Sequence, residues 1–167
     1  MSFQFHPATD NDVDDIVRLR NDAAAHLTST YGKGPYSGNV TDKGVRFEMR
    51  QATAYVARDA DGVLVATVTL GTRKPWAIDP AYFSKSKKPL YLTSMAVAPS
   101  MQRRGVGRQC IDEARRITRE WSADFIRLDA YDHAGGAGEF YARCGFREMG
   151  RVVYRECPLV YYECVIE

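Results

Sequence analysis

The sequence has no long hydrophobic run. No stretch of its 167 residues approaches the roughly 20 consecutive apolar residues that a membrane-spanning helix needs. The opening residues, Met1 to Gln4, also lack the basic and apolar regions of a secretory signal peptide. We therefore expect a cytoplasmic protein that has no membrane as a partner.

Cysteine and histidine are scarce and scattered. The 4 cysteines include no Cys-x-x-Cys pair, and the 3 histidines form no cluster with Cys or Asp at the spacing of a zinc site. No metal site is predicted. In a reducing cytoplasm we expect packed thiols, and not disulfides, at Cys110, Cys144, Cys157 and Cys164.

An excess of charge of one sign is also missing. The chain carries 23 Lys and Arg residues against 21 Asp and Glu residues, a formal net charge of +2, with no long block of Lys or Arg. This balance argues against a nucleic acid as the main partner. With 45% hydrophobic and 26% charged residues, the chain fits one soluble domain, residues 1–167, with a substantial core.

The most informative pattern lies in residues 90–121. An apolar strand, Leu90 to Val97, is followed by Pro99 and by a loop that contains Gly105 and Gly107. A long helix with one apolar face then follows. The residues of this face are Val106, Cys110, Ala114, Ile117 and Trp121.

The start of this helix is a predicted anion site. Its first backbone N–H groups lack partners within the helix, and the helix dipole adds partial positive charge there. Gly105 and Gly107 leave the backbone open to a pyrophosphate. Arg103, Arg104 and Arg108 add fixed positive charge.

Two familiar phosphate-binding loops do not match this segment. A Walker-type P-loop needs Lys-Ser or Lys-Thr directly after its last glycine, whereas Arg108 and Gln109 follow Gly107. A dinucleotide-binding G-x-G-x-x-G loop needs a third glycine where Cys110 stands. A nucleotide-binding protein is therefore disfavoured.

The loop reads Gln-x-x-Gly-x-Gly from Gln102 to Gly107, after a strand that ends in Val-x-Pro. It resembles the acetyl-CoA loop of the GNAT family of N-acetyltransferases. A second segment, Phe140 to Phe146, is similar to the family's helix-ending Tyr-x-x-x-Gly-Phe motif and follows a predicted strand, residues 125–131. The two motifs occur in the family's order, each on the expected element.

The resemblance implies an α/β fold with a mixed, mostly antiparallel central sheet flanked by helices. It also implies acetyl-CoA bound in a cleft where two parallel central strands diverge. One of the backbone N–H groups near Met95, Ala96 and Val97 would stabilise the oxyanion of the reaction. The residues that it assigns to coenzyme A are Met95, Ala96, Val97, Gln102, Arg103, Arg104, Gly105, Val106, Gly107 and Arg108. One departure is Ala134, which stands where many relatives have an asparagine that contacts coenzyme A.

The resemblance assigns protonation of the departing thiolate to Tyr141. A phenol near pKa 10 that protonates a thiolate near 8.5 works uphill by roughly 2 kcal/mol. Tyr141 therefore needs a lowered pKa or acts mainly as a hydrogen-bond donor; the alternative is a role in packing alone. Cys110 and Cys144 do not resemble nucleophiles, since one lies on an apolar face and the other at a helix C-terminus.

A general base is useful because a lysine-like acceptor amine is mostly charged at neutral pH. No single residue stands out, and a water chain is an equal alternative. The candidates are Glu48, His26, Asp129 and His133.

The rest of the chain alternates between strand and helix patterns. It predicts a helix from about Val13 that ends before Tyr31, a short helix capped by Thr41, and a short helix that ends at Arg143. Predicted strands cover residues 53–57, 63–70, 125–131, 148–155 and 159–166.

Two irregular segments complete the sequence. Tyr31 and Tyr36 flank a glycine-proline segment that, by the resemblance, can shape the acceptor pocket. Residues 71–88 form an insertion whose aromatic residues, Trp76, Tyr82 and Phe83, argue against disorder. We expect this insertion to be a pocket wall or a contact in a homodimer.

The function implied by the resemblance is acetyl-CoA-dependent acetylation of a primary amine by direct attack. No motif identifies the acceptor, so a small molecule (a metabolite or an antibiotic), a peptide N-terminus and a protein lysine all remain open. The alternative is a non-catalytic module of the same fold that binds or senses acyl-CoA. Retention of Tyr141 favours the enzyme.

Overall fold

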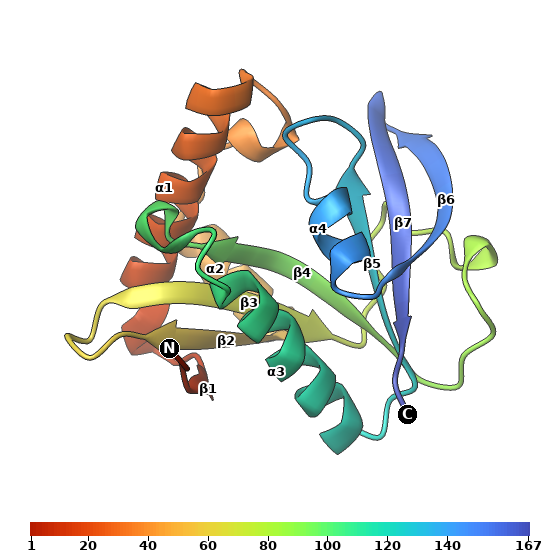
Figure 1. Cartoon of the computed structure of the whole chain (residues 1–167), viewed down its shortest axis with the longest axis horizontal. Coiled ribbons are helices and arrows are strands. Elements are labelled where there is room, and N and C mark those ends of the chain that lie inside the picture. Colours follow the sequence, from red (N-terminus) through yellow and green to blue (C-terminus); the bar gives the residue numbers. More distant parts are fainter.

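One seven-stranded sheet, in the order β1-β2-β3-β4-β5-β7-β6, runs through the molecule (Figure 1). The computed structural model describes all residues, 1–167. Only β4 and β5 pair in parallel, and the other neighbouring strands are antiparallel. The predicted mixed, mostly antiparallel sheet is confirmed. The strands are β1 (Phe5–Pro7), β2 (Thr53–Arg58), β3 (Leu64–Gly71), β4 (Pro89–Val97), β5 (Phe125–Tyr131), β6 (Arg147–Tyr154) and β7 (Cys157–Val165).

Helices cover both faces of the sheet (Figure 1). They are α1 (Val13–Tyr31), α2 (Asp42–Gln51), α3 (Val106–Glu120) and α4 (Gly138–Arg143). In β2, Tyr55 and Ala57 belong to the core cluster of α3 and α4, whereas Val56 between them belongs to the cluster of α1 and α2. Because side chains alternate along a strand, the two pairs of helices lie on opposite faces.

The buried face of α3 is the predicted one. Val106, Cys110, Ala114 and Ile117 are each at most 1% exposed. Trp121 lies just beyond the last residue of the helix and is half-buried. The helical period of the apolar residues therefore identified the side of α3 that packs on the sheet.

α1 includes Tyr31, so the prediction that the helix ends before this residue was wrong. The helix ends at Gly32, whose φ of 84° lies in the left-handed region where glycine closes helices without strain. The chain therefore keeps its helical bonds up to the first residue that can form this cap. The buried residues of α1 are Val13, Ile16, Leu19 and Ala23.

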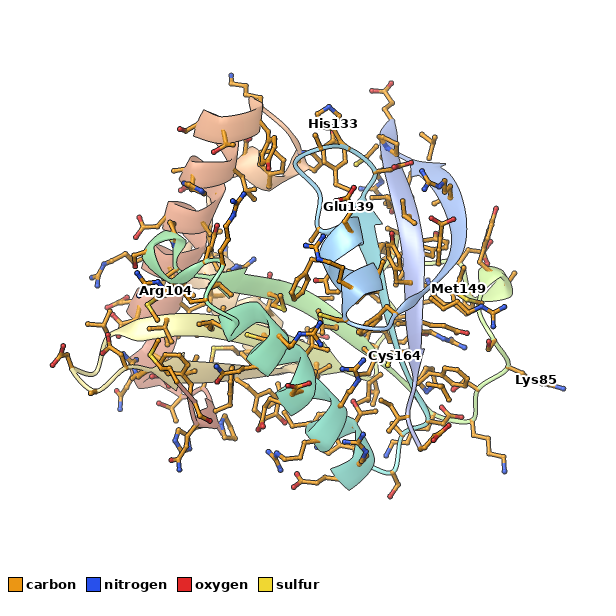
Figure 2. All side chains as sticks on the ribbon, viewed as in Figure 1. Lys85, Arg104, His133, Glu139, Met149 and Cys164 are labelled. Atoms are coloured by element: carbon orange, nitrogen blue, oxygen red, sulfur yellow. The ribbon has the colours of Figure 1, made fainter.

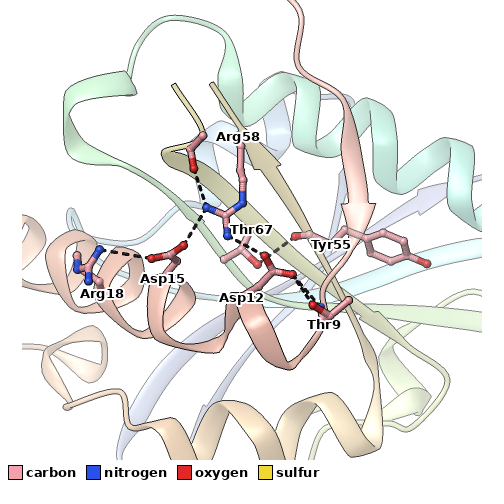
Figure 3. A network of polar contacts seen from close by, with 8 residues as sticks. Thr9, Asp12, Asp15, Arg18, Tyr55, Arg58 and Thr67 are labelled. Carbon is pink, nitrogen blue, oxygen red and sulfur yellow. Dashed lines mark hydrogen bonds and ion pairs between the residues drawn. The ribbon is translucent and has the colours of Figure 1, made fainter. Parts of the chain in front are cut away.

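A polar network fixes the start of α1 to β2 (Figure 3). Arg58 donates to Asp12 at 2.7 Å and pairs with Asp15 at 2.8 Å. Burial acts to raise the pKa of Asp12, but the Thr9 N–H and the Arg58 guanidinium outweigh it and lower the pKa. These contacts hold α1 against the sheet at a fixed angle.

Residues 71–88 are anchored to the strands β5 and β7. Arg127 donates to the Ser84 carbonyl at 2.7 Å, and Glu163 accepts from the Ser84 N–H at 3.1 Å. Phe83 packs against Tyr161, with ring centroids 5.1 Å apart. Figure 2 shows Lys85 of this segment extending away from the molecule. The segment is therefore an ordered cover over one end of the sheet.

No helix of the protein is both long enough and apolar enough to cross a membrane. No three His, Cys, Asp or Glu side chains are arranged to hold a metal ion.

Candidate active site

β4 and β5 separate in the middle of the sheet. Their parallel pairing covers only Pro89 to Tyr91 and Phe125 to Arg127, although β4 continues to Val97 and β5 to Tyr131. Beyond the paired residues, the edge of β4 that faces β5 has no strand partner. Main-chain N–H and C=O groups need hydrogen-bond partners, so the unpaired groups of this edge can bond to an extended ligand.

β4 has a bulge in the part that is no longer paired with β5. Thr67 and Thr69 of β3 pair with Ala96 and Thr93, so β4 has one more residue than β3 between these pairs. The bulge contains Ser94, where the backbone is kinked with a φ of 50°. This is the left-handed region, which residues other than glycine rarely adopt. Residues 95–97, which follow the kink, have no partner in β5.

The loop after β4 leads directly into α3. Gln102 Nε2 donates to the Val97 carbonyl at 3.2 Å and so ties the loop to the strand end. Gly105 precedes the helix with a φ of 82°, which glycine adopts without strain. A Cβ atom on Gly107 would lie 3.1 Å from the Phe140 ring. The helix start on which the predicted anion site depends is therefore present, with a tightly packed glycine in its first turn.

A cleft of about 550 Å³ joins these elements. Eight of the ten residues assigned to coenzyme A line it: Met95, Ala96, Val97, Gln102, Arg103, Gly105, Gly107 and Arg108. Arg104 and Val106 do not line it, because Arg104 is exposed on the loop (Figure 2) and Val106 is buried beneath the helix. The two motifs are brought together, since Phe140 and Cys144 line the opposite wall.

α4 is held across the cleft by arginines of α3. Arg108 donates to the Arg143 carbonyl at 3.0 Å, and Arg115 donates to the Cys144 carbonyl. The last carbonyls of a helix lack partners within it and carry partial negative charge, which favours a guanidinium at this end. These bonds fix the position of α4 relative to the loop at Gly107.

Tyr141 points into the core beside the cleft. It is 7% exposed and packs against Phe146 and Tyr162. Its hydroxyl has no hydrogen-bond partner in the chain. Arg127 Nε is the only fully buried side-chain nitrogen or oxygen without a partner, so the Tyr141 hydroxyl oxygen is not fully buried. The Tyr141 hydroxyl therefore reaches a small opening. Burial raises the pKa of Tyr141, and nearby acidic groups add to this effect.

A second cavity, of about 420 Å³, lies next to the cleft. The two share Ala23, Leu27, Met95 and Ala96, so a group in one cavity can reach a group in the other. Glu48 and Tyr36 line the second cavity, whereas Tyr31 does not. No residue of the insertion 71–88 lines either cavity, which does not support its interpretation as a pocket wall.

The candidates for a general base have different surroundings. Glu48 forms an ion pair with Arg20 at 2.8 Å and lines the second cavity. Asp129 lies on β5 beyond the part that pairs with β4, and burial raises its pKa. His26 is exposed on α1. His133 is exposed in the loop after β5 (Figure 2). It stacks on Tyr131, with ring centroids 5.2 Å apart.

The loop after β5 follows its own path around Ala134. A Cβ atom on Gly136 would lie 1.8 Å from the Tyr131 carbonyl oxygen, so only glycine fits there. A Cβ atom on Gly135 would lie 2.8 Å from the Tyr36 ring. The loop thus folds back on β5 and packs against the segment after α1. The two glycines permit this path.

The cysteines are packed thiols. Cys110 is fully buried, and burial raises its pKa to about 12. Burial also raises the pKa of Cys144. A thiol that stays protonated is a poor nucleophile, in agreement with the prediction that neither cysteine attacks the thioester.

Comparison with known proteins gives the family. The sequence profile of the acetyltransferase (GNAT) family matches residues 18–146. The chain belongs to this family. Members of the GNAT family use acetyl-CoA, so the predicted cosubstrate is confirmed. A search of curated proteins found no match.

Solved GNAT structures share the fold. A GNAT acetyltransferase from Listeria monocytogenes superposes with a TM-score of 0.77 at 20% identity, over 98% of this chain and 95% of that chain. The ribosomal-protein-alanine N-acetyltransferase of Brucella melitensis gives 0.72 at 18% identity, over 98% and 99%. The acetyltransferase yncA of Salmonella typhimurium, solved with its cofactor acetyl-CoA, gives 0.69 at 16% identity, over 100% and 95%.

Sequence reasoning missed several residues of this GNAT site. Phe140 lines the cleft and its neighbour Tyr141 does not. The motif alone could not show which of the two side chains faces the cleft. Arg20 and Ser94 line the second cavity together with Glu48. These three residues come from α1, α2 and β4 and carry no shared sequence signal, so only the folded structure brings them together.

Proposed function

We propose that the protein transfers the acetyl group of acetyl-CoA to a primary amine of a small molecule or peptide by direct attack. The observation that carries the proposal is the unpaired edge of β4, which opens on one side to the glycine loop and on the other to the second cavity. A cosubstrate in the cleft and an amine in the second cavity would meet at Met95 and Ala96, the strand residues common to both.

Binding of coenzyme A would divide between the loop and the strand. Arg103, Arg108 and the N–H groups at the start of α3 suit the pyrophosphate, because a helix N-terminus and guanidinium groups both favour anions. Main-chain groups of residues 95–97 would pair with the amide groups of the pantetheine arm. Phe140 covers the loop at Gly107 and would pack on this arm.

In the transfer step the amine nitrogen attacks the thioester carbonyl carbon and forms a tetrahedral oxyanion. A backbone N–H near Ala96 would stabilise that oxyanion. The C–S bond then breaks, the amine loses a proton, and the coenzyme A thiolate gains one. Because burial raises the pKa of Tyr141, we propose that Tyr141 donates a hydrogen bond to the thiolate and does not transfer its proton.

The test has two parts. Calorimetric titration with acetyl-CoA should show binding, and release of free thiol should then appear with at least one amine from a panel of small amines, amino acids and short peptides. Binding without thiol release from any amine would favour the non-catalytic acyl-CoA module. No binding of acetyl-CoA would overturn both interpretations.

A further inference from the structure

Three polar residues from separate elements meet at the kink in β4. Glu48 of α2 accepts hydrogen bonds from Arg20 of α1, at 2.8 and 3.4 Å, and from the Ser94 hydroxyl, at 3.3 Å. The Arg20 side chain is only 18% exposed and that of Glu48 is 39% exposed. The network is therefore partly shielded from water, where charged hydrogen bonds are stronger than on an open surface.

The network holds the residue that most needs support. Ser94 has a φ of 50°, a conformation that costs free energy for a residue with a side chain and persists only where neighbouring contacts enforce it. The Ser94 hydroxyl links this kink to Glu48 of α2 and, through Glu48, to Arg20 of α1. Without the bond to Glu48, an ordinary extended conformation becomes more favourable for Ser94.

The same three residues separate the second cavity from the interior. Arg20, Glu48 and Ser94 line the cavity of about 420 Å³, and they also line a void of about 10 Å³ behind it, against Thr67 and Thr69. A void of this size holds at most about one water molecule. The network is thus closely backed by β3, and a displacement of Glu48 cannot be absorbed on that side.

Glu48 has little capacity left for other partners. An ionised carboxylate offers about four acceptor sites, and hydrogen bonds from Arg20 and Ser94 already occupy three of them. This arrangement fits a side chain that supports the backbone better than one that collects protons from an amine.

We propose that Arg20 and Glu48 are positioning residues which, through the Ser94 hydroxyl, hold the kink of β4 in the geometry that aligns residues 95–97 with the acyl carbonyl. This inference rests on the proposed function. The pyrophosphate-binding loop lies beyond Val97, and none of the three network residues lines the cleft there, so the phosphate contacts of coenzyme A are separable from acyl alignment.

The expected result is a split between kcat and coenzyme A affinity. Glu48→Gln and Ser94→Ala should each lower kcat between about 10- and 100-fold, since small misplacement of reacting groups has effects of this size. The Kd of coenzyme A should stay within about 2-fold, because the phosphate contacts are intact. Arg18→Gln is the matched control, since Arg18 also lies on α1 but is 72% exposed and pairs only with Asp15.

A double-variant comparison tests the mechanism. If both residues act through one kink, Glu48→Gln combined with Ser94→Ala should lose about as much kcat as either change alone. Circular dichroism of each variant would establish that it is folded. Additive losses, or a kcat within about 2-fold of the original protein in both single variants, would overturn the proposal.

The pH profile separates positioning from base catalysis. Glu48→Gln should lower kcat/KM at every pH and keep the shape of the profile. Loss of the acidic limb of the profile would identify Glu48 as the general base and overturn the positioning role.

Failure of the proposed function gives a different result. If acetyl-CoA binds but no amine yields free thiol, the transferase proposal fails, and the ratio of the Kd values for coenzyme A and acetyl-CoA then decides the inference. Ser94→Ala and Glu48→Gln should lower this ratio by weakening acetyl-CoA alone. An unchanged ratio in both variants would overturn the role of the network.

Discussion

The Tyr141 hydroxyl combines an apolar setting with a small opening to solvent. Burial raises its pKa, so the neutral phenol persists to a higher pH than a free tyrosine near 10. The uphill proton transfer to a thiolate therefore becomes steeper than for an unperturbed phenol. The sequence left open a lowered pKa or a hydrogen-bonding role, and this environment favours the second.

Tyr141→Phe should lower kcat by about 10-fold or more and leave the Kd of acetyl-CoA within about 2-fold, because the hydroxyl acts only as the thiolate forms. Steady-state kinetics and calorimetry would measure the two quantities. Tyr162→Phe is the control, since Tyr162 is 6% exposed in the same core cluster. An equal loss in both variants would assign Tyr141 to packing.

Gly136→Ala should destabilise the protein by at least about 2 kcal/mol, because overfilling a packed site shifts the backbone. The added Cβ would lie 1.8 Å from the Tyr131 carbonyl oxygen. Urea denaturation would measure the change in the free energy of unfolding. Gly38→Ala is the control, since its Cβ would meet nothing within 4 Å; equal stability of the two variants would contradict the tight loop.

At the scale of single elements, the first turn of α3 is the predicted anion site. Arg108 there both lines the cleft and donates to the Arg143 carbonyl at 3.0 Å. The same side chain thus serves the cleft directly and fixes α4 across it. At the other end of α3, Arg119 is exposed and far from the cleft.

Arg108→Gln should weaken coenzyme A and acetyl-CoA alike, by roughly 10-fold, the size of one hydrogen bond to a charged group. The salt dependence of binding should also become less steep, since one fixed positive charge is lost. Titrations at two salt concentrations would measure both effects. Arg119→Gln should change neither, and a similar loss in that variant would indicate a nonspecific effect of net charge.

Local sequence patterns predicted the helices and strands better than they predicted the contacts between them. The apolar period of α3 and the glycines at 105 and 107 identified a buried face and an open helix start, because both depend on residues close in sequence. The kink at Ser94 has no such signal, since no glycine marks it. The contacts of Arg20 and Glu48 with Ser94 depend on the packing of three elements and were invisible for the same reason.

At the scale of the whole molecule, buried thiols and phenols couple stability to alkaline pH. The Cys110 thiol has its pKa raised from 9.0 to about 12 by burial. The folded protein therefore keeps a proton that the unfolded chain loses in this range. Stability is unaffected below the unfolded pKa and decreases as the pH rises toward the folded pKa.

The free energy of unfolding should fall between about pH 9 and 11 by roughly 1 kcal/mol per pH unit for Cys110 alone. Tyr141 should add to the decrease at the upper end, since its pKa is also raised. Cys110→Ala should make the dependence shallower. Urea denaturation at a series of pH values would measure the slopes, and parallel curves for the two proteins would contradict this linkage.

The family and the mixed sheet were predictable for the whole chain because two motifs lie on strands and helices of clear pattern. The identity of the acceptor was not, since the second cavity is built from α1, α2 and the segment between them, with no motif. Tyr36 and Gly135 show the reason. They touch across the molecule, although nearly a hundred positions separate them.

Only three residue pairs between β4 and β5 join the two parts of the sheet, β1-β2-β3-β4 and β5-β7-β6. An extended ligand that bonds to the open edge of β4 would fill the gap between these two parts and extend the sheet's hydrogen bonding. Amide hydrogen exchange at residues 93–97 should therefore slow when acetyl-CoA binds, and a concentration of 100 times Kd should add about 2.7 kcal/mol to the unfolding free energy. The ligand-free protein should come apart first along this line, so its lifetime against proteases would depend on the cosubstrate supply.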